Sequence, residues 1–313
     1  MKKGFSFRKK IGWLRHFAIM AVLVSPGFAE EEDVEALNDD RSSRPVQVLL
    51  VTGQDLHDWR STTPVLKDLI EEDTRLGVTV VEDPSFLASE KIHDFDVMVH
   101  HWMDYNVDPP GEEARTQYKR FVYQGKGLVL VHFACGAFQD WPEFAKIAGR
   151  VWDPKLRGHD PRGGFQVEIV DKAHPITKGL PDFQTDDELY TCLAGEEPIH
   201  VLAQAVSKVD GKPYPMAFVH RYGKGNVFHC VLGHDPKAFR PEGVKTLFRR
   251  GCAWAAGVSV PRCDFEHSNA PQEGSERTGS LSLRPIVAPL WIGFTECALS
   301  VRHDHPGPAG SSR

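Results

Sequence analysis

The feature that most constrains the fold is a series of short, nearly continuous apolar runs. The first, Val46 to Val51, ends in Thr52-Gly53. Runs that are apolar on both faces are typical of parallel strands buried between two layers of helices. The same pattern of apolar residues predicts further strands at residues 78–81, 95–100 and 127–132.

Segments with helical spacing separate these strands. A helix is predicted over residues 64–72, with Pro64 near its first turn and a capping hydroxyl among residues 61–63. Two more helices are predicted over residues 112–123 and 141–148. This alternation of strand and helix, with short connections, is typical of a doubly wound parallel sheet.

Beyond residue 160 the strands lie closer together in the sequence, which favours antiparallel partners. They are predicted at residues 164–170, 199–206, 214–220 and 226–232, and a helix over residues 246–256 follows them. The whole pattern predicts one α/β domain over residues 45–257. Its sheet is expected to be doubly wound and mostly parallel, with a few antiparallel edge strands.

Residues 1–29 have the order of a secretory signal peptide. The segment holds six basic residues and no acidic one, followed by the apolar run Phe17 to Val24 and by Gly27 and Ala29 at small-residue positions. The apolar run is too short for a good transmembrane span. We therefore expect an exported protein, periplasmic or extracellular, with no stable membrane span after the leader is cleaved.

Two polar segments flank the domain. Residues 30–44 are an acidic linker, and residues 258–313, rich in Ser, Gly, Pro and Arg, predict a disordered tail. Removing the six positive charges of the leader takes the formal net charge from −6 to −12. An acidic protein is a poor partner for phosphate backbones, so no nucleic-acid binding is expected.

Histidines follow four of the predicted strands. Ligands of an open parallel sheet bind outside the carboxyl ends of its strands, where such residues gather. The four are His57, His101, His132 and His234. One histidine at such a position is usually a structural hydrogen-bonding residue, whereas four on independent strands predict a polar pocket.

The residue types in and near this pocket suit several kinds of chemistry. Imidazoles move protons or bind metals. The run Asp186 to Tyr190 offers three acids and a phenol, with a solvated turn as the alternative. Trp102 offers a flat apolar ring to a sugar, with core packing as the alternative. Binding of a divalent metal ion is a further alternative, since imidazoles and carboxylates from separate strands form metal sites without a local motif. No cofactor is firmly implied.

Cys135 raises the alternative of a cysteine hydrolase. It lies shortly after a predicted strand among small residues, and it could pair with His234 from a later strand. Phe133, however, occupies the position where a GxCxG turn has glycine, and His234 is followed by Asp-Pro. A packed free thiol is the favoured interpretation.

Seven motifs in order over residues 46–257 resemble the ThuA-like trehalose-utilisation family. They are Val51–Trp59, Gly127–His132, His174–Leu180, Asp186–Tyr190, Tyr222–Phe228, Leu232–Asp235 and Trp254–Gly257. The resemblance implies a class I glutamine amidotransferase-like (flavodoxin-like) fold without glutaminase activity, and a link to keto-derivatives of disaccharides. The positions that it marks are His57, His132, Glu188, Tyr190 and His234.

The main hypothesis is an exported enzyme that acts on a keto-sugar or disaccharide derivative by His/Glu proton transfer, as an isomerase, lyase or hydrolase. A C–H beside a carbonyl is acidic enough for a side-chain base to remove its proton. The candidate catalytic residues are His132 or Glu188 as base and His234 as acid or orienting group. The candidate substrate-binding residues are His57, His101, Trp102 and Tyr190. A non-catalytic domain that binds a sugar or a partner is the alternative, followed by the Cys135 hydrolase.

Overall fold

The computed structural model describes residues 44–260. The predicted signal peptide, most of the predicted linker and nearly all of the predicted tail lie outside the described residues and stay predictions. Within the described range, helices and strands alternate in the expected manner. No helix between residues 44 and 260 is long and apolar enough to cross a membrane.

Nine strands form one sheet in the order β2-β1-β3-β4-β9-β8-β7-β5-β6. The first five strands of this order run parallel to one another. They are β2 (Leu76–Val81), β1 (Val46–Val51), β3 (Val97–His100), β4 (Gly127–Val131) and β9 (Gly225–Cys230). All residues of β3 and β4 are buried, because helices cover both faces of this part of the sheet.

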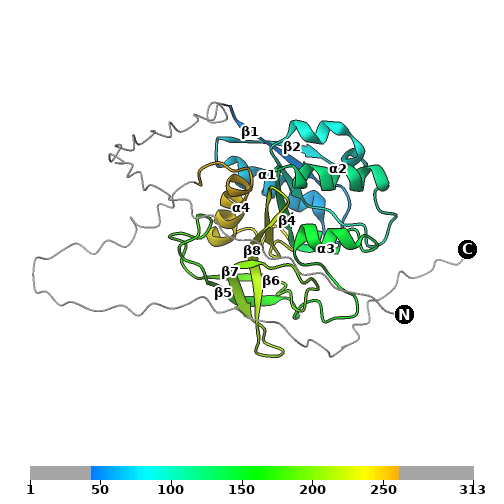
Figure 1. The fold of residues 1–313 in the computed structure, drawn as a ribbon. Coiled ribbons are helices and arrows are strands. Elements are labelled where there is room, and N and C mark those ends of the chain that lie inside the picture. The colour runs from blue at the N-terminus through cyan, green and yellow to red at the C-terminus, as the bar shows by residue number, and fades with distance from the viewer. Residues whose placement is uncertain (1–43, 261–313) are drawn as a thin grey trace, which may run out of the picture. The chain divides into compact units, whose positions relative to one another are not determined.

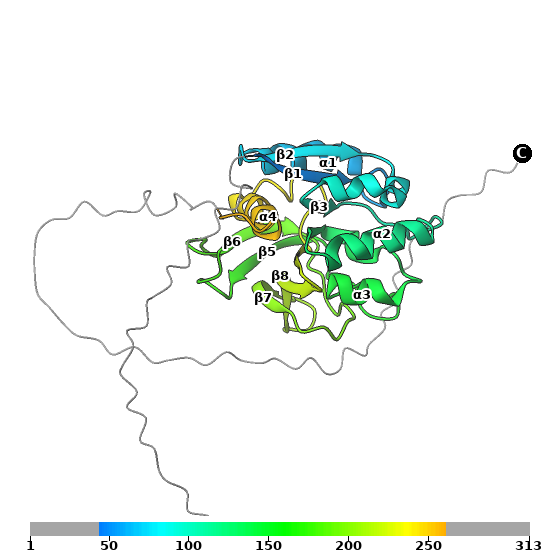
Figure 2. The same ribbon diagram turned by 45° about the horizontal axis from the view of Figure 1, so that its top comes forward.

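Four α-helices cover the parallel strands in two layers (Figures 1 and 2). On one face α1 (Trp59–Glu71) packs against α4 (Glu242–Ala255). On the other face α2 (Glu112–Tyr123) contacts α3 (Pro142–Ala148) through Tyr118 and Phe144. Three short 3₁₀ helices occur in the connections of this half. They are η2 (Pro84–Ala88), η3 (Glu90–Asp94) and η4 (His132–Gly136).

Antiparallel strands complete the sheet beyond β9. They are β8 (Pro213–Tyr222), β7 (His200–Val206), β5 (Gly163–Ile169) and β6 (Phe183–Asp187). The predicted fold class is therefore confirmed, including its antiparallel edge. β6 is absent from the predicted strands, because its alternation of buried Thr185 and Asp187 with exposed residues lies inside an acidic run.

The predicted start of the first helix is wrong. α1 begins at Trp59, and the carboxylate of Asp58 caps it by accepting the backbone N–H of Ser61. Pro64 lies inside the helix rather than in its first turn. A proline there removes one backbone donor of the helix. The aspartate that caps α1 thus lies directly after His57, at the edge of the sheet that holds the strand-end histidines.

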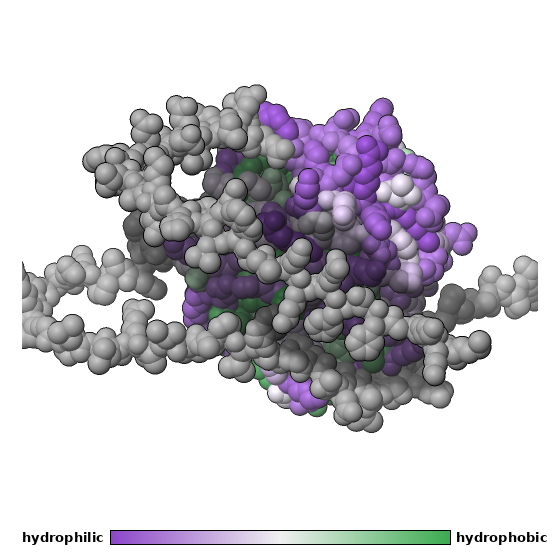
Figure 3. All heavy atoms as spheres, viewed as in Figure 1, coloured by the Kyte–Doolittle hydropathy of each residue, from purple (hydrophilic) through white to green (hydrophobic). Residues whose placement is uncertain are grey.

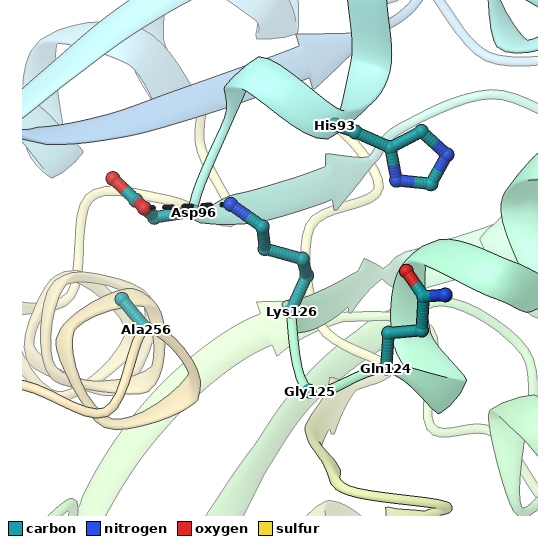
Figure 4. Close-up of a pocket in the computed structure, with 6 residues that line it drawn as sticks. All are labelled: His93, Asp96, Gln124, Gly125, Lys126 and Ala256. Carbon is teal, nitrogen blue, oxygen red and sulfur yellow. Dashed lines mark ion pairs between the residues drawn. The ribbon is translucent and has the colours of Figure 1, made fainter. Parts of the chain in front are cut away.

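The face displayed in Figure 3 is mostly hydrophilic where the described atoms are visible. A cavity of about 310 Å³ lies at the amino ends of β3 and β4 (Figure 4). Asp96 and Lys126, which precede these strands, form an ion pair of 3.7 Å beside it. The strand-end histidines follow the carboxyl ends of the strands, so this cavity lies at the opposite edge of the sheet from them.

Gly53 allows the turn that leads from β1 toward His57. Its φ is +107°, and an added Cβ would lie 1.7 Å from the backbone oxygen of Glu82. We expect Gly53→Ala to lower the free energy of unfolding by about 3 kcal/mol, because the backbone must move to relieve both strain and clash. Urea denaturation measures this. The matched control is Gly163→Ala, whose Cβ meets nothing within 4 Å; equal losses in both variants would contradict the assignment.

Candidate functional site

Four strand-end side chains converge at the carboxyl edge of the sheet. They are His57 after β1, His132 after β4, Glu188 after β6 and His234 after β9. One nitrogen or oxygen from each lies within 4.8 Å of the others, and we call this set the His/Glu cluster. The topology explains the convergence, since β1, β4 and β9 are parallel and end at one edge, and β6 brings Glu188 to the same place.

Glu188 lies at the centre of the His/Glu cluster. Its Oε2 is 3.3 Å from Nδ1 of His234, 3.5 Å from Nε2 of His132 and 3.9 Å from Nε2 of His57. Its Oε1 lies 3.8 Å from Nε2 of His159. Three imidazoles therefore face one carboxylate oxygen, and a fourth faces the other oxygen.

His57 is held by the residue two positions before it. Asp55 Oδ1 lies 2.7 Å from His57 Nδ1 and also accepts the backbone N–H of His57 at 2.9 Å. Because an ionised carboxylate only accepts, Nδ1 carries the proton and Nε2 is left to face the cluster. Burial lowers the pKa of His57, an effect that Asp55 only partly offsets, so this imidazole is neutral at pH 7.

His132 forms the buried floor of the cluster, with 2% of its surface exposed. Its φ is +49°, in the left-handed region that non-glycine residues seldom adopt and that is common at functional sites. Nδ1 donates to the carbonyl of Val231 at 2.8 Å, which leaves Nε2 facing Glu188 and, at 3.3 Å, the hydroxyl of Tyr190. Both bonds fix the ring.

Asp187 joins the end of β6 to the loop after β9. This buried carboxylate accepts backbone N–H groups of Gly233 at 2.8 Å and His234 at 3.3 Å, and also that of Glu188 at 2.8 Å. Burial raises its pKa, against the effects of His132 and these donors. One side chain therefore fixes the backbone positions of two cluster residues, Glu188 and His234.

Charge within the cluster is strongly coupled. Burial alone would raise the pKa of Glu188, but contact with His132 and His234 outweighs it and holds that pKa well below its usual range. Burial would likewise lower the pKa of His132, yet Glu188 and Asp187 raise it above 6.5. In the absence of other ligands, the pair is therefore an ionised carboxylate beside an imidazole that readily holds a proton.

Two predicted substrate contacts are not brought to the cluster. Trp102 has no exposed surface, and its ring stacks on His100 with centroids 4.6 Å apart. His101 is also buried, with Nε2 3.2 Å from the hydroxyl of Thr62. Both side chains belong to the core, so the prediction that Trp102 faces a sugar is not supported by its position. The predicted Tyr190 does lie at the cluster, with its hydroxyl on His132.

His159 is the residue that sequence reasoning missed. It lies in the connection between α3 and β5, and an isolated bridge pairs its backbone with that of Tyr190. Its ring stacks on Tyr190 with centroids 5.8 Å apart, and its side chain is 26% exposed. It follows no strand, so no pattern of strand ends could indicate it.

Aromatic rings adjoin the cluster at His57. Phe133 lies 5.8 Å from His57 and 6.2 Å from Tyr105, between ring centroids, and Tyr105 is 44% exposed. Trp152 packs on the other side of Phe133 at 5.0 Å. Tyr105 therefore offers the exposed flat ring that was predicted for Trp102.

Cys135 has the properties of a packed thiol. It has no exposed surface, and burial raises its pKa well above the usual range of a thiol. Thiolate formation is what makes a cysteine nucleophilic, and burial in apolar surroundings opposes it. The hydrolase alternative based on Cys135 gains no support from this environment.

Comparison with known proteins identifies the family. The family model for ThuA, described as trehalose utilisation, matches residues 47–255. The chain belongs to the ThuA family. A ThuA-like protein from Parabacteroides merdae has 29% identity and a TM-score of 0.62 over 70% of this chain and 93% of its own. One from Bacteroides uniformis has 18% identity and a TM-score of 0.53 over 68% and 92%. None of the curated proteins compared matches significantly.

The family membership confirms the resemblance seen in the motifs, and it supports a role related to carbohydrate. The match spans the described sheet and all four residues of the His/Glu cluster. The likeness to the Bacteroides uniformis structure, at 18% identity, is evidence for the fold alone.

The coupling between Glu188 and His132 predicts a pH-dependent stability. Because the pKa of Glu188 is lowered in the folded protein, its ionised form stabilises the fold above pH 4.5, and this stabilisation is lost as pH falls toward the folded pKa. Because the pKa of His132 is raised, its protonated form stabilises the fold below pH 6.5, and this stabilisation is lost as pH rises through the folded pKa. Wild type should therefore exceed Glu188→Gln in unfolding free energy most between these pH values, by about 2 kcal/mol. Denaturant titrations in EDTA measure this, and a gap that is flat from pH 3 to 9 would contradict it.

Proposed function

We propose that this ThuA-family protein is an enzyme that moves a proton on a keto-sugar or disaccharide derivative at the His/Glu cluster. The observation that carries the proposal is the convergence of four imidazoles on the two oxygens of Glu188, at distances of 3.3 to 3.9 Å. Such a set offers both donors and acceptors of protons within reach of one substrate. The carbohydrate class is supported by the family's description.

The charges of the cluster favour particular roles. Glu188 is a weak base, because its pKa lies far below neutrality, so it acts through its charge and orients the imidazoles. The raised pKa of His132 favours its protonated form, which suits the stabilisation of negative charge on a keto oxygen. His159 faces Glu188 Oε1, with 26% of its side chain exposed, and lies outside the group of three imidazoles that face Oε2. We assign the proton-accepting role to His159.

The proposed step balances without an added reagent. The imidazole of His159 removes the proton from the carbon beside the carbonyl, and the C–H electrons form an enolate whose oxygen carries the charge. Isomerisation follows when the His159 imidazolium returns the proton to the former carbonyl carbon while the α-hydroxyl proton moves to the enolate oxygen, which leaves the ketone on the neighbouring carbon. Elimination follows when the enolate electrons expel a β-oxygen substituent, which leaves with the proton from the His159 imidazolium. Both outcomes share the first step, so that step is the one to measure.

Turnover and proton exchange of a 3-keto-glycoside test the proposal. We expect His159→Ala and Glu188→Gln each to lower kcat/KM at least 100-fold, the size of contribution expected of general acid–base catalysis. Exchange of the C–H beside the carbonyl in D₂O, followed by NMR, should slow in parallel.

The matched control is His200→Ala, an imidazole with a 56% exposed side chain that pairs with Asp171 away from the cluster. It should retain wild-type turnover. Losses of no more than threefold in both cluster variants would overturn the proposal. Calorimetric binding of the sugar with no chemical change would instead favour the non-catalytic binding domain.

Tyr105 is proposed to contact the sugar ring. Its exposed ring contacts Phe133, which in turn contacts His57, and suits stacking on the apolar face of a pyranose. Tyr105→Ala should raise KM roughly fivefold, equivalent to about 1 kcal/mol, with kcat little changed, and Tyr105→Phe should retain wild-type KM. Steady-state kinetics measure both. The control Tyr123→Ala removes another exposed tyrosine, at the end of α2, and equal effects in both alanine variants would argue against stacking.

A further inference from the structure

We propose that His57, His132, His234 and Glu188 together bind one divalent first-row transition-metal ion, with Zn²⁺ as the natural first probe. The inference deepens the proposed function and rests on it for the ion's chemical role. The ligand set would be three imidazole nitrogens and one carboxylate oxygen, each from a different strand end. Four protein ligands complete a tetrahedral set, so a substrate oxygen would join as a fifth ligand, an expansion that catalytic zinc sites show.

The distances from Glu188 Oε2 to the three facing nitrogens fit a shared ion. Metal–ligand bonds of about 2.0–2.1 Å in a tetrahedral site place neighbouring ligand atoms about 3.3 Å apart. Glu188 Oε2 lies 3.3, 3.5 and 3.9 Å from the facing nitrogens of His234, His132 and His57. A hydrogen bond from an N–H to an oxygen would instead bring the atoms to about 2.9 Å. The atoms are thus spaced as ligands of a common centre rather than as partners of one another.

The outer contacts of the imidazoles orient them as metal ligands. Metal-binding histidines usually donate their second N–H to a carboxylate or a backbone carbonyl, which fixes the tautomer and the ring. His57 Nδ1 pairs with Asp55 at 2.7 Å, and His132 Nδ1 pairs with the carbonyl of Val231 at 2.8 Å. In both rings the other nitrogen, Nε2, faces the cluster, and an ion would take the place of the proton that His132 holds there in the metal-free cluster.

His234 supplies an independent observation. Its Nδ1 is buried and makes no hydrogen bond, although it lies 3.3 Å from Glu188 Oε2. A buried polar atom without a partner is costly, so it calls for a ligand that the protein atoms do not provide. The same nitrogen is the one that belongs to the group of four.

The donor set selects among ions. Imidazole-rich sites suit Zn²⁺, Fe²⁺, Mn²⁺, Co²⁺ and Ni²⁺, whereas Mg²⁺ and Ca²⁺ prefer carboxylates, carbonyls and water. A bound ion would act as a Lewis acid on the keto oxygen of the proposed substrate, in place of the proton that His132 holds in the metal-free cluster. Glu188 Oε1 and His159 stay outside the ligand set, so the proton-accepting role proposed for His159 is compatible with the ion.

Metal content and metal-dependent stability test the site without any assay of turnover. The full-length protein, stripped with chelator and dialysed, should bind one equivalent of Zn²⁺ per chain by calorimetry and by elemental analysis. Saturating Zn²⁺ should raise Tm by roughly 5–10 °C, and Ca²⁺ should not. Co²⁺ should give the visible absorption bands of a low-symmetry site.

Two variants locate the ion. His234→Ala and the double variant His57→Ala/His234→Ala should weaken Zn²⁺ binding at least 100-fold. The control His174→Ala/His200→Ala removes two imidazoles 5.8 Å apart outside the cluster, one half-buried and one exposed, and should bind as wild type. Circular dichroism checks folding, and the single variant keeps the test valid if the double variant is unstable.

Absence of Zn²⁺, Mn²⁺ and Co²⁺ binding at 100 µM ion, or equal loss in the cluster and control variants, would overturn the metal site. The proposed function is tested separately. One bound ion without turnover of the keto-sugar would contradict the function and support the metal site, whereas turnover in chelator with no bound ion would support the function and contradict a catalytic role for the ion.

Discussion

The charge on Glu188 is the constraint around which the carboxyl edge of the sheet is organised. An ionised carboxylate with little exposed surface must be matched by nearby donors or cations, because burying an unmatched charge costs several kcal/mol. In this protein the match is made by imidazoles from three other strand ends and one connection. The rings of His57, His132 and His159 are in turn held by Asp55, Val231 and Asp160, and Asp187 holds the backbone of His234. The charge on Glu188 and the positions of the imidazoles therefore depend on one another.

The fold brings these groups together across a large separation in sequence. Parallel strands β1, β4 and β9 deliver His57, His132 and His234 to one edge, and the antiparallel half returns the chain so that β6 ends there too. Asp187 makes this arrangement specific, since its buried carboxylate binds the backbone of Gly233 and His234 across the sheet edge. The antiparallel strands are therefore part of the site rather than an appendage of the parallel half.

Much of this could be predicted from sequence because the determining signals are local. Buried parallel strands are apolar on both faces, and the helix over residues 112–123 was predicted with its observed bounds. Strand ends then identify His57, His132 and His234 without knowledge of their contacts. Glu188 and Tyr190 came through family motifs, because β6 is short and polar and has no strand-like apolar signal.

The remainder depended on contacts that sequence patterns do not encode. Trp102 follows a strand, yet its ring is fully buried and stacks on His100, which contacts Tyr118 of α2 and Phe144 of α3. His159 reaches Glu188 from an irregular connection, held by its bridge to Tyr190. Side-chain direction after a strand and the path of a connection are both set by tertiary packing.

The most direct measurement of the central claim is X-ray absorption spectroscopy of the zinc-loaded protein. The account predicts a first shell of nitrogen and oxygen at about 2.0–2.1 Å, with outer-shell scattering from three imidazoles and no sulfur. A shell of oxygen atoms alone, or one that includes sulfur near 2.3 Å, would contradict the assignment of His57, His132, His234 and Glu188 as the ligands.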